Sequence, residues 1–154
     1  MKIKRGHLKF ITIILTTLFI ATSAFAAGLD QGKVTKITGS AMYKKAGAAD
    51  WSKLQVGTTL SEGDSLKTAD NSEVVMELKG AHKTAEITVR QKSEFIFKTF
   101  QYDEATKVDT TLLDVSLGAV LVKAEKLVGT SKFEVKTPTS IVGIRGTTFE
   151  VKVA

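Results

Sequence analysis

The sequence predicts a single all-β domain, and three features of residues 27–154 support that class. Thr, Val and Ile supply 35 of these 128 residues, and β-branched side chains favour strands over helices. Apolar and polar residues alternate one by one in several segments, which is typical of strands with one buried face. Such segments recur about every ten residues and are separated by polar or glycine-bearing turns.

The strands are identified in chain order from this alternation and from the turns between them. The predicted strands are 33–38, 40–45, 64–68, 73–78, 85–90, 93–98, 110–115, 118–123, 132–136, 140–144 and 147–153. The inward residues of the fourth strand are predicted to be Val74, Met76 and Leu78.

Two parts of this pattern leave alternatives open. The segment 100–109 is polar and less regular, so it is expected to form either an extended hairpin tip or a loop. Many short strands in one domain suit a β-helix (solenoid), a sandwich or a barrel. No strict internal repeat accompanies them, so periodicity alone does not select the solenoid.

The first 26 residues have the organisation of a secretory signal peptide. Basic residues at 2–9 precede an apolar core at 10–20, and Ala24 and Ala26 supply the small residues before Ala27. An apolar core of this length is short of the roughly 20 residues that span a bilayer as a helix. We expect cleavage after Ala26 and a periplasmic or secreted domain at 27–154, with membrane attachment only if the segment stays uncleaved.

Composition narrows the functional classes. The formal charge of +6 falls to +2 without the signal segment, since 18 basic and 16 acidic residues remain, so no broad nucleic-acid footprint is expected. There is no Cys, and His82 is the one histidine outside the signal segment, which disfavours metal sites and histidine-centred catalysis. Phosphate-binding glycine loops are also missing. We therefore expect a protein that is not an enzyme and that binds neither a metal nor a cofactor.

Two ordered motifs resemble a known family. Residues 63–68 read Gly-Asp-Ser-Leu-Lys-Thr, and 137–151 begin with Thr-Pro and end with Arg-Gly-Thr-Thr-Phe-Glu-Val. In this order and at this separation they resemble the FecR domain, over nearly all of 32–153. The motif residues, which we expect to be structural, are Gly63, Asp64, Thr68, Thr137, Pro138, Arg145, Gly146, Thr147 and Phe149.

The resemblance implies a compact β-helical module outside the inner membrane. In iron-transport regulators such a module belongs to a relay between an outer-membrane receptor and an inner-membrane anti-sigma segment. The sequence departs from that arrangement, because no cytoplasmic region precedes the apolar segment and the chain stops at Ala154. The segment 80–109 is also longer and more polar than the family pattern. A stand-alone extracytoplasmic form is therefore expected.

Single residues within this pattern allow a structural and a functional interpretation. Arg145, between two glycines, is expected to pair with an acid such as Asp64 or Glu134, the alternative being an anion site. Asp64 is interpreted as a turn residue bonded to nearby backbone. Trp51, the single tryptophan, is interpreted as a core residue or as an exposed anchor for a partner.

The candidate contact residues on the surface are Trp51, Phe100 and Tyr102. The favoured hypothesis is a non-catalytic module that recognises an envelope protein through strand edges or the 98–110 segment, by addition of a partner strand. The alternative is a carbohydrate or cell-wall binding module in which Trp51 and Tyr102 stack on sugars.

Overall fold

A computed structural model describes residues 31–79, 83–103, 105–127, 129–144, 146 and 148–153. The predicted signal peptide with Ala24, Ala26 and Ala27 lies outside the described residues, as do His82, Arg145 and Thr147. Within the described part of the chain, no helix is long and apolar enough to cross a membrane.

The described residues form one 12-stranded sheet. Its strands are β1 (Gln31–Thr38), β2 (Ala41–Lys44), β3 (Ser52–Lys53), β4 (Thr59–Leu60), β5 (Ser65–Thr68), β6 (Glu73–Lys79), β7 (Lys83–Val89), β8 (Glu94–Asp103), β9 (Val108–Ala124), β10 (Lys132–Lys136), β11 (Ile141–Ile144) and β12 (Thr148–Val153). The main path runs β3-β2-β5-β8-β9-β7-β6-β1-β4, while β10 and β12 also pair with β9, and β11 pairs with β10.

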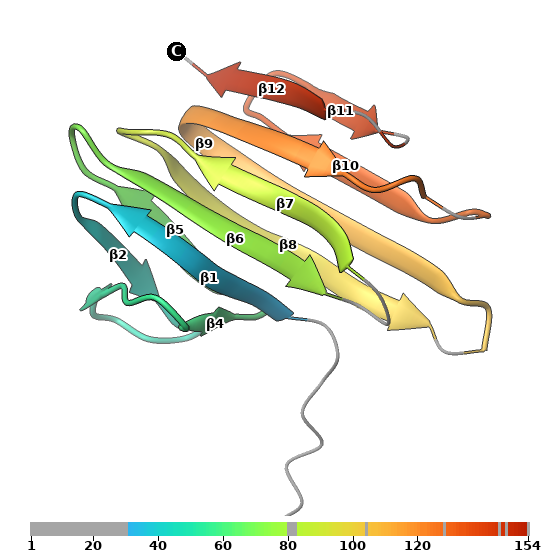
Figure 1. Cartoon of the computed structure of the whole chain (residues 1–154), viewed down its shortest axis with the longest axis horizontal. Coiled ribbons are helices and arrows are strands. Elements are labelled where there is room, and N and C mark those ends of the chain that lie inside the picture. Colours follow the sequence, from blue (N-terminus) through green and yellow to red (C-terminus); the bar gives the residue numbers. More distant parts are fainter. Residues whose placement is uncertain are drawn as a thin grey trace, which may run out of the picture.

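The long strand β9 joins the two halves of this sheet. Its first part, to Leu117, pairs with β8 and β10, and its second part, from Gly118, pairs with β7 and β12. Gly118 has φ +85°, a left-handed conformation that glycine adopts without strain. The sheet therefore curls at this point, and one half faces the other (Figure 1).

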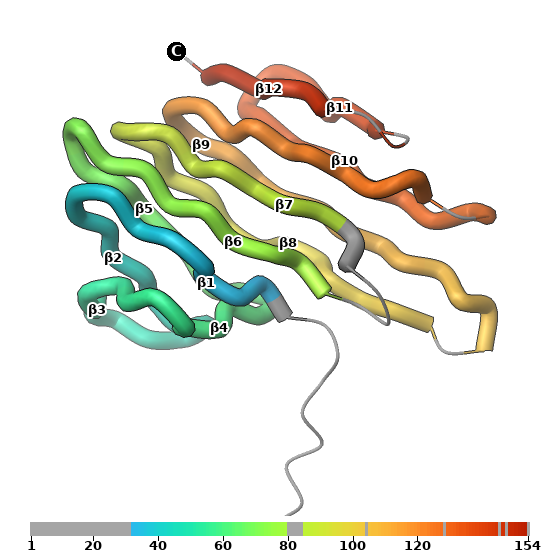
Figure 2. The backbone as a smooth tube through the Cα atoms, viewed as in Figure 1, coloured from blue at the N-terminus to red at the C-terminus, as the bar shows by residue number. Residues whose placement is uncertain are grey.

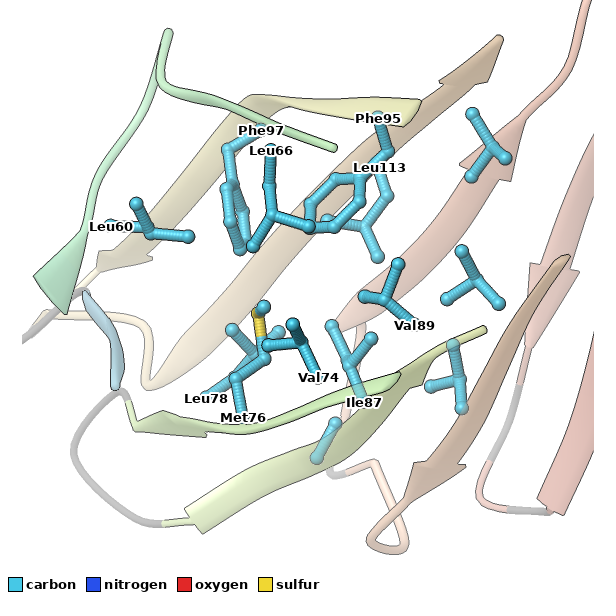
Figure 3. Close-up of a cluster of buried hydrophobic side chains, with 14 of the residues drawn as sticks. Leu60, Leu66, Val74, Met76, Leu78, Ile87, Val89, Phe95, Phe97 and Leu113 are labelled. Carbon is cyan, nitrogen blue, oxygen red and sulfur yellow. The ribbon is translucent and has the colours of Figure 1, made fainter. Parts of the chain in front are cut away.

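The hydrophobic core lies between the two halves. Phe95 and Phe97 of β8 are fully buried and meet edge to face, with ring centroids 5.1 Å apart. Side chains of β6 and β7 approach them from the other half of the sheet (Figure 3). The three inward residues predicted on β6 are Val74, Met76 and Leu78, and all three are fully buried. The alternation of the sequence thus identifies the buried face correctly.

The all-β class is confirmed, whereas the solenoid detail is not. A β-helix stacks parallel strands from successive coils, but every pairing in the described sheet is antiparallel except that of β9 with β10. The tube in Figure 2 follows β1, β6 and β7 as neighbouring strands of a curled antiparallel sheet. Short turns between neighbouring strands favour this arrangement.

The largest differences from the predicted strands lie at β9 and at the segment 100–109. Segments 110–115 and 118–123 belong to the single strand β9, because Gly118 bends the strand and does not end it. The segment 100–109 is a hairpin, since β8 continues to Asp103 and β9 begins at Val108. The two short strands β3 and β4 carry too few residues for alternation to reveal them.

Candidate protein-binding edge

The strand β11 lies at an edge of the curled sheet. It pairs with β10 along one side, from Phe133 opposite Ile144 to Lys136 opposite Ile141, and with no other described strand. In Figure 2, β11 and β12 lie along one margin of the molecule, and β1 to β4 lie toward the opposite margin. The second side of β11 is therefore open among the described residues.

The composition of this edge is apolar and uncharged. Ile141 is 63% exposed and Val142 is 37% exposed, and both belong to the large apolar side chains that the fold leaves on its surface. Gly143 is also exposed, while Ile144 turns toward the core. Edge strands are usually protected from pairing by charges, prolines or extreme shortness, and the residues of β11 carry neither charge nor proline.

The turn before β11 determines which backbone groups face outward. The Thr137 N–H donates to the Ser140 carbonyl over 2.8 Å, and the Ser140 N–H donates to the Thr137 hydroxyl over 3.0 Å. In an antiparallel ladder, residue pairs that exchange backbone hydrogen bonds alternate with pairs that do not. The closing pair of Thr137 and Ser140 is a bonded pair, so the next pair along the ladder is not bonded. Ile141 and Gly143 therefore direct their N–H and C=O groups away from β10, where a further strand would bind them.

A hollow of about 400 Å³ lies at one end of the β10–β11 pair, and its walls include Phe133, Glu134 and Gly143. A Cβ atom built on Gly143 would meet no heavy atom within 4 Å. A side chain from an added strand therefore has room opposite Gly143. Such a hollow offers space for one anchoring side chain, which is how strand-binding proteins obtain specificity.

The other edges of the described sheet are less suited to strand addition. The edge strand β12 carries the charged residues Glu150 and Lys152, and charge on an edge opposes unspecific pairing. The strands β3 and β4 at the ends of the main path are two residues long. Among the described edges, β11 combines useful length with an uncharged surface.

The first motif organises turns through its polar residues Asp64 and Thr68. Asp64 is 2% exposed, and its carboxylate accepts bonds from the Ser61 and Ala46 N–H groups and from Lys45. Gly63 has φ +86° in the same turn. The Thr68 hydroxyl donates to the carbonyl oxygen of Arg90 and accepts the N–H of Ser93. These contacts join loops that are distant in sequence.

The second motif lies around the candidate edge. Thr137 closes the turn before β11, and Pro138 lies inside that turn. Gly146 has φ +67°, and a Cβ atom there would be 2.9 Å from the Cα of Lys126, so close approach of two backbones requires glycine. Phe149 packs half-buried against the core. Among the described residues, the cation that pairs with Asp64 is Lys45, at 2.6 Å, while the predicted pairing of Arg145 with Asp64 or Glu134 stays a prediction.

The prediction that Phe100 is a surface contact is wrong. Its side chain is 5% exposed. The register between β8 and β9 shifts between Phe97 and Thr99, as at a β-bulge, which moves the inward position from residue 99 to residue 100. A bulge leaves no signature in simple alternation, so the sequence pattern could not indicate this inversion.

The other two surface candidates are only partly exposed. Tyr102, near the hairpin tip, is half-buried, and the Lys107 ammonium lies 5.9 Å from its ring centroid. Trp51 is also half-buried, with the Lys67 ammonium 4.1 Å from its ring centroid. Each ring thus has at least one lysine ammonium near it, a feature that the sequence did not reveal.

The hairpin tip beyond Tyr102 is closed by one carboxylate. Hydrogen bonds from the Thr106 N–H, the Thr106 hydroxyl and the Ala105 N–H lower the pKa of Asp103 below its ordinary value of 3.8. The Asp103 Oδ1 atom lies 2.8 Å from the Ala105 nitrogen and 3.1 Å from the Thr106 nitrogen. The ionised carboxylate therefore stabilises this turn.

This arrangement predicts a pH-dependent turn. Because the folded pKa is depressed, the stabilisation is present above the ordinary pKa and is lost as the pH falls through the folded value. We expect the amide resonances of Ala105 and Thr106 to titrate with a midpoint below 3.8 in a two-dimensional NMR spectrum. In Asp103→Asn this titration should vanish, and an unchanged titration in that variant would contradict the assignment.

A larger groove of about 800 Å³ lies on the outer face of the other half-sheet. Arg90 there lies 2.7 Å from Glu73 and 3.5 Å from Glu150, so both acids of the groove are engaged by one guanidinium. Among the described residues, no group of three His, Cys, Asp or Glu side chains is placed to hold a metal ion. The groove therefore presents an ion-pair network on the sheet surface.

These features define a small all-β domain with a curled antiparallel sheet, a buried polar framework of motif residues and an open apolar edge. A family model described as FecR protein matches residues 64–154, and the chain belongs to this family. FecR proteins are signalling regulators that take part in envelope signalling, and FecR domains are typically periplasmic or envelope-associated in bacteria. No curated protein and no solved structure matches the chain.

Proposed function

We propose that this protein is a non-catalytic, extracytoplasmic FecR module that binds another envelope protein by adding a partner strand to β11. The observation that carries the proposal is the open side of β11, where Ile141 and Gly143 direct backbone donors and acceptors outward. Strand addition supplies affinity through main-chain hydrogen bonds and specificity through alternate side chains. The apolar side chains of β11 add surface that a partner would remove from water.

The cellular location in this proposal rests on two supports. The first 26 residues have the charge pattern and the small residues of a cleavable signal, with Ala27 as the first residue of the mature domain. Membership of the FecR family agrees with a periplasmic or envelope-associated domain. In this proposal the mature domain comprises residues 27–154.

The test compares proline and alanine at one position. Gly143→Pro removes an outward N–H without removing a bond to β10, and proline is tolerated at the free side of an edge strand. Gly143→Ala keeps that N–H, and its Cβ meets nothing within 4 Å. We expect the proline variant to bind the envelope partner about tenfold more weakly, as loss of one hydrogen bond and a steric block imply. The alanine variant keeps the main-chain hydrogen bond, so it should lose clearly less binding than the proline variant.

The measurement is crosslinked capture from native envelope, with the captured proteins quantified by mass spectrometry for all three forms. Circular dichroism and thermal unfolding must first show that both variants retain the fold. One dominant partner whose capture falls much more with proline than with alanine supports strand addition to β11. Equal capture by the folded proline and alanine variants rejects β11 as the binding edge.

A further inference from the structure

Two lysines converge on the single tryptophan of the chain, at the opposite margin from β11. The Lys67 ammonium of β5 lies 4.1 Å from the ring centroid of Trp51, and the Lys44 ammonium of β2 lies 5.2 Å from it. Strand β2 pairs with both β3 and β5, so neighbouring strands bring these residues together. Because both distances share one centroid, the two nitrogens lie within about 9 Å of one another.

Neither of these lysines has an acidic partner among the described residues. The neighbouring Lys45 provides the contrast, since it reaches the buried carboxylate of Asp64 at 2.6 Å. Lys53 of β3 adds a third exposed cation opposite Met42. The indole ring attracts both ammonium groups and so gathers two like charges at one side chain without neutralising them. Their N–H donors remain available for an external anion.

We propose that Trp51, Lys44 and Lys67 form a binding site for a phosphate group, either free or on a lipid headgroup. A phosphate carries up to two negative charges and several acceptor oxygens, so it can bridge two ammonium groups. The attraction of both ammonium groups to the ring keeps the two lysines near one another before an anion arrives, which reduces the entropy lost on binding. An uncharged sugar stacking on the same ring would first have to displace the two cations.

Binding at this site can be followed by tryptophan fluorescence, because Trp51 is the single tryptophan of the chain. The wild-type protein, exported and with its N-terminus verified by mass spectrometry, is titrated separately with inorganic phosphate, phosphatidylglycerol vesicles and phosphatidylcholine vesicles. A bound phosphate changes the charge next to the ring, so we expect a saturable change in tryptophan emission with phosphate or with the anionic vesicles. Vesicle sedimentation and calorimetry with phosphate give readouts that do not depend on the ring.

The decisive comparison uses two doubly substituted proteins of equal charge. In Lys44→Gln/Lys67→Gln, the concentration of phosphate or of phosphatidylglycerol that gives half-saturation should rise at least about tenfold. This is the effect expected from losing a charged hydrogen bond. Lys123→Gln/Lys152→Gln, on the other half of the sheet, should change that concentration less than about twofold, because screened distant charges contribute little. A response to both probes assigns the site to the phosphate group itself, and a response to one identifies the source.

Three results would overturn the proposal. The first is the absence of a saturable response to both inorganic phosphate and phosphatidylglycerol. The second is an equal loss in the two doubly substituted proteins, which would indicate attraction by net charge alone. The third is equal binding to phosphatidylcholine, whose phosphate is neutralised by its own choline, because this would indicate apolar adsorption of the tryptophan surface.

Discussion

Gly118→Ala is expected to destabilise the domain by at least about 3 kcal/mol, since it combines a left-handed backbone with a backbone clash. The φ of Gly118 is +85°, and its added Cβ would lie 2.2 Å from the Ser93 Oγ and 2.6 Å from the Lys92 carbonyl oxygen. Ser93 cannot move aside easily, because its hydroxyl bonds to the N–H and the carbonyl of Ala119. The bend of β9 would have to open to accept a single methyl group.

The measurement is urea unfolding followed by circular dichroism, with Gly143→Ala as the matched control. That glycine has no positive φ and an empty Cβ site, so its substitution should change the free energy of unfolding by less than about 0.5 kcal/mol. Equal and small effects at the two positions would show that the curl of the sheet does not depend on Gly118. Failure of Gly118→Ala to fold at all agrees with the expectation, provided that the control folds normally.

The sequence pattern predicts the strands better than their arrangement. Alternation of side chains reflects burial of one face, and it correctly placed Val74, Met76 and Leu78 in the core. Strand order depends instead on contacts between distant segments, which local alternation does not encode. Gly118 illustrates the difference. A glycine within an apolar run indicates either a bend in a strand or the end of a strand, and the sequence does not distinguish the two. Only the pairing of β9 with four other strands shows that it is a bend.

The candidate binding edge was only partly predictable for the same reason. The sequence predicts a strand at 140–144 and a structural role for Pro138, just before it. Exposure of Ile141 follows from the absence of a further neighbour, which is a property of the assembled sheet. The setting of Trp51 likewise depends on pairing, since β2 and β5 meet only in the folded sheet and bring their lysines to one ring.

The second large effect is expected at Asp64, whose carboxylate joins two loops. Its Oδ1 accepts the Ala46 N–H at 2.9 Å, and its Oδ2 accepts the Ser61 N–H at 2.9 Å and the Lys45 ammonium at 2.6 Å. Asp64→Ala leaves two backbone donors near a buried position without their acceptor. Each such loss costs about 1–3 kcal/mol, so we expect a destabilisation of about 2–5 kcal/mol.

Two further variants separate the backbone bonds from the ion pair. Asp64→Asn keeps one oxygen acceptor but turns an amide N–H₂ toward another donor, so its effect should be intermediate. Lys45→Met removes the cation alone, and because the Lys45 side chain is 49% exposed, we expect a loss below about 1 kcal/mol. Urea unfolding of the three variants gives the order. If Lys45→Met cost as much as Asp64→Ala, the ion pair would be the stabilising contact and the capture of the two loop N–H groups would be secondary.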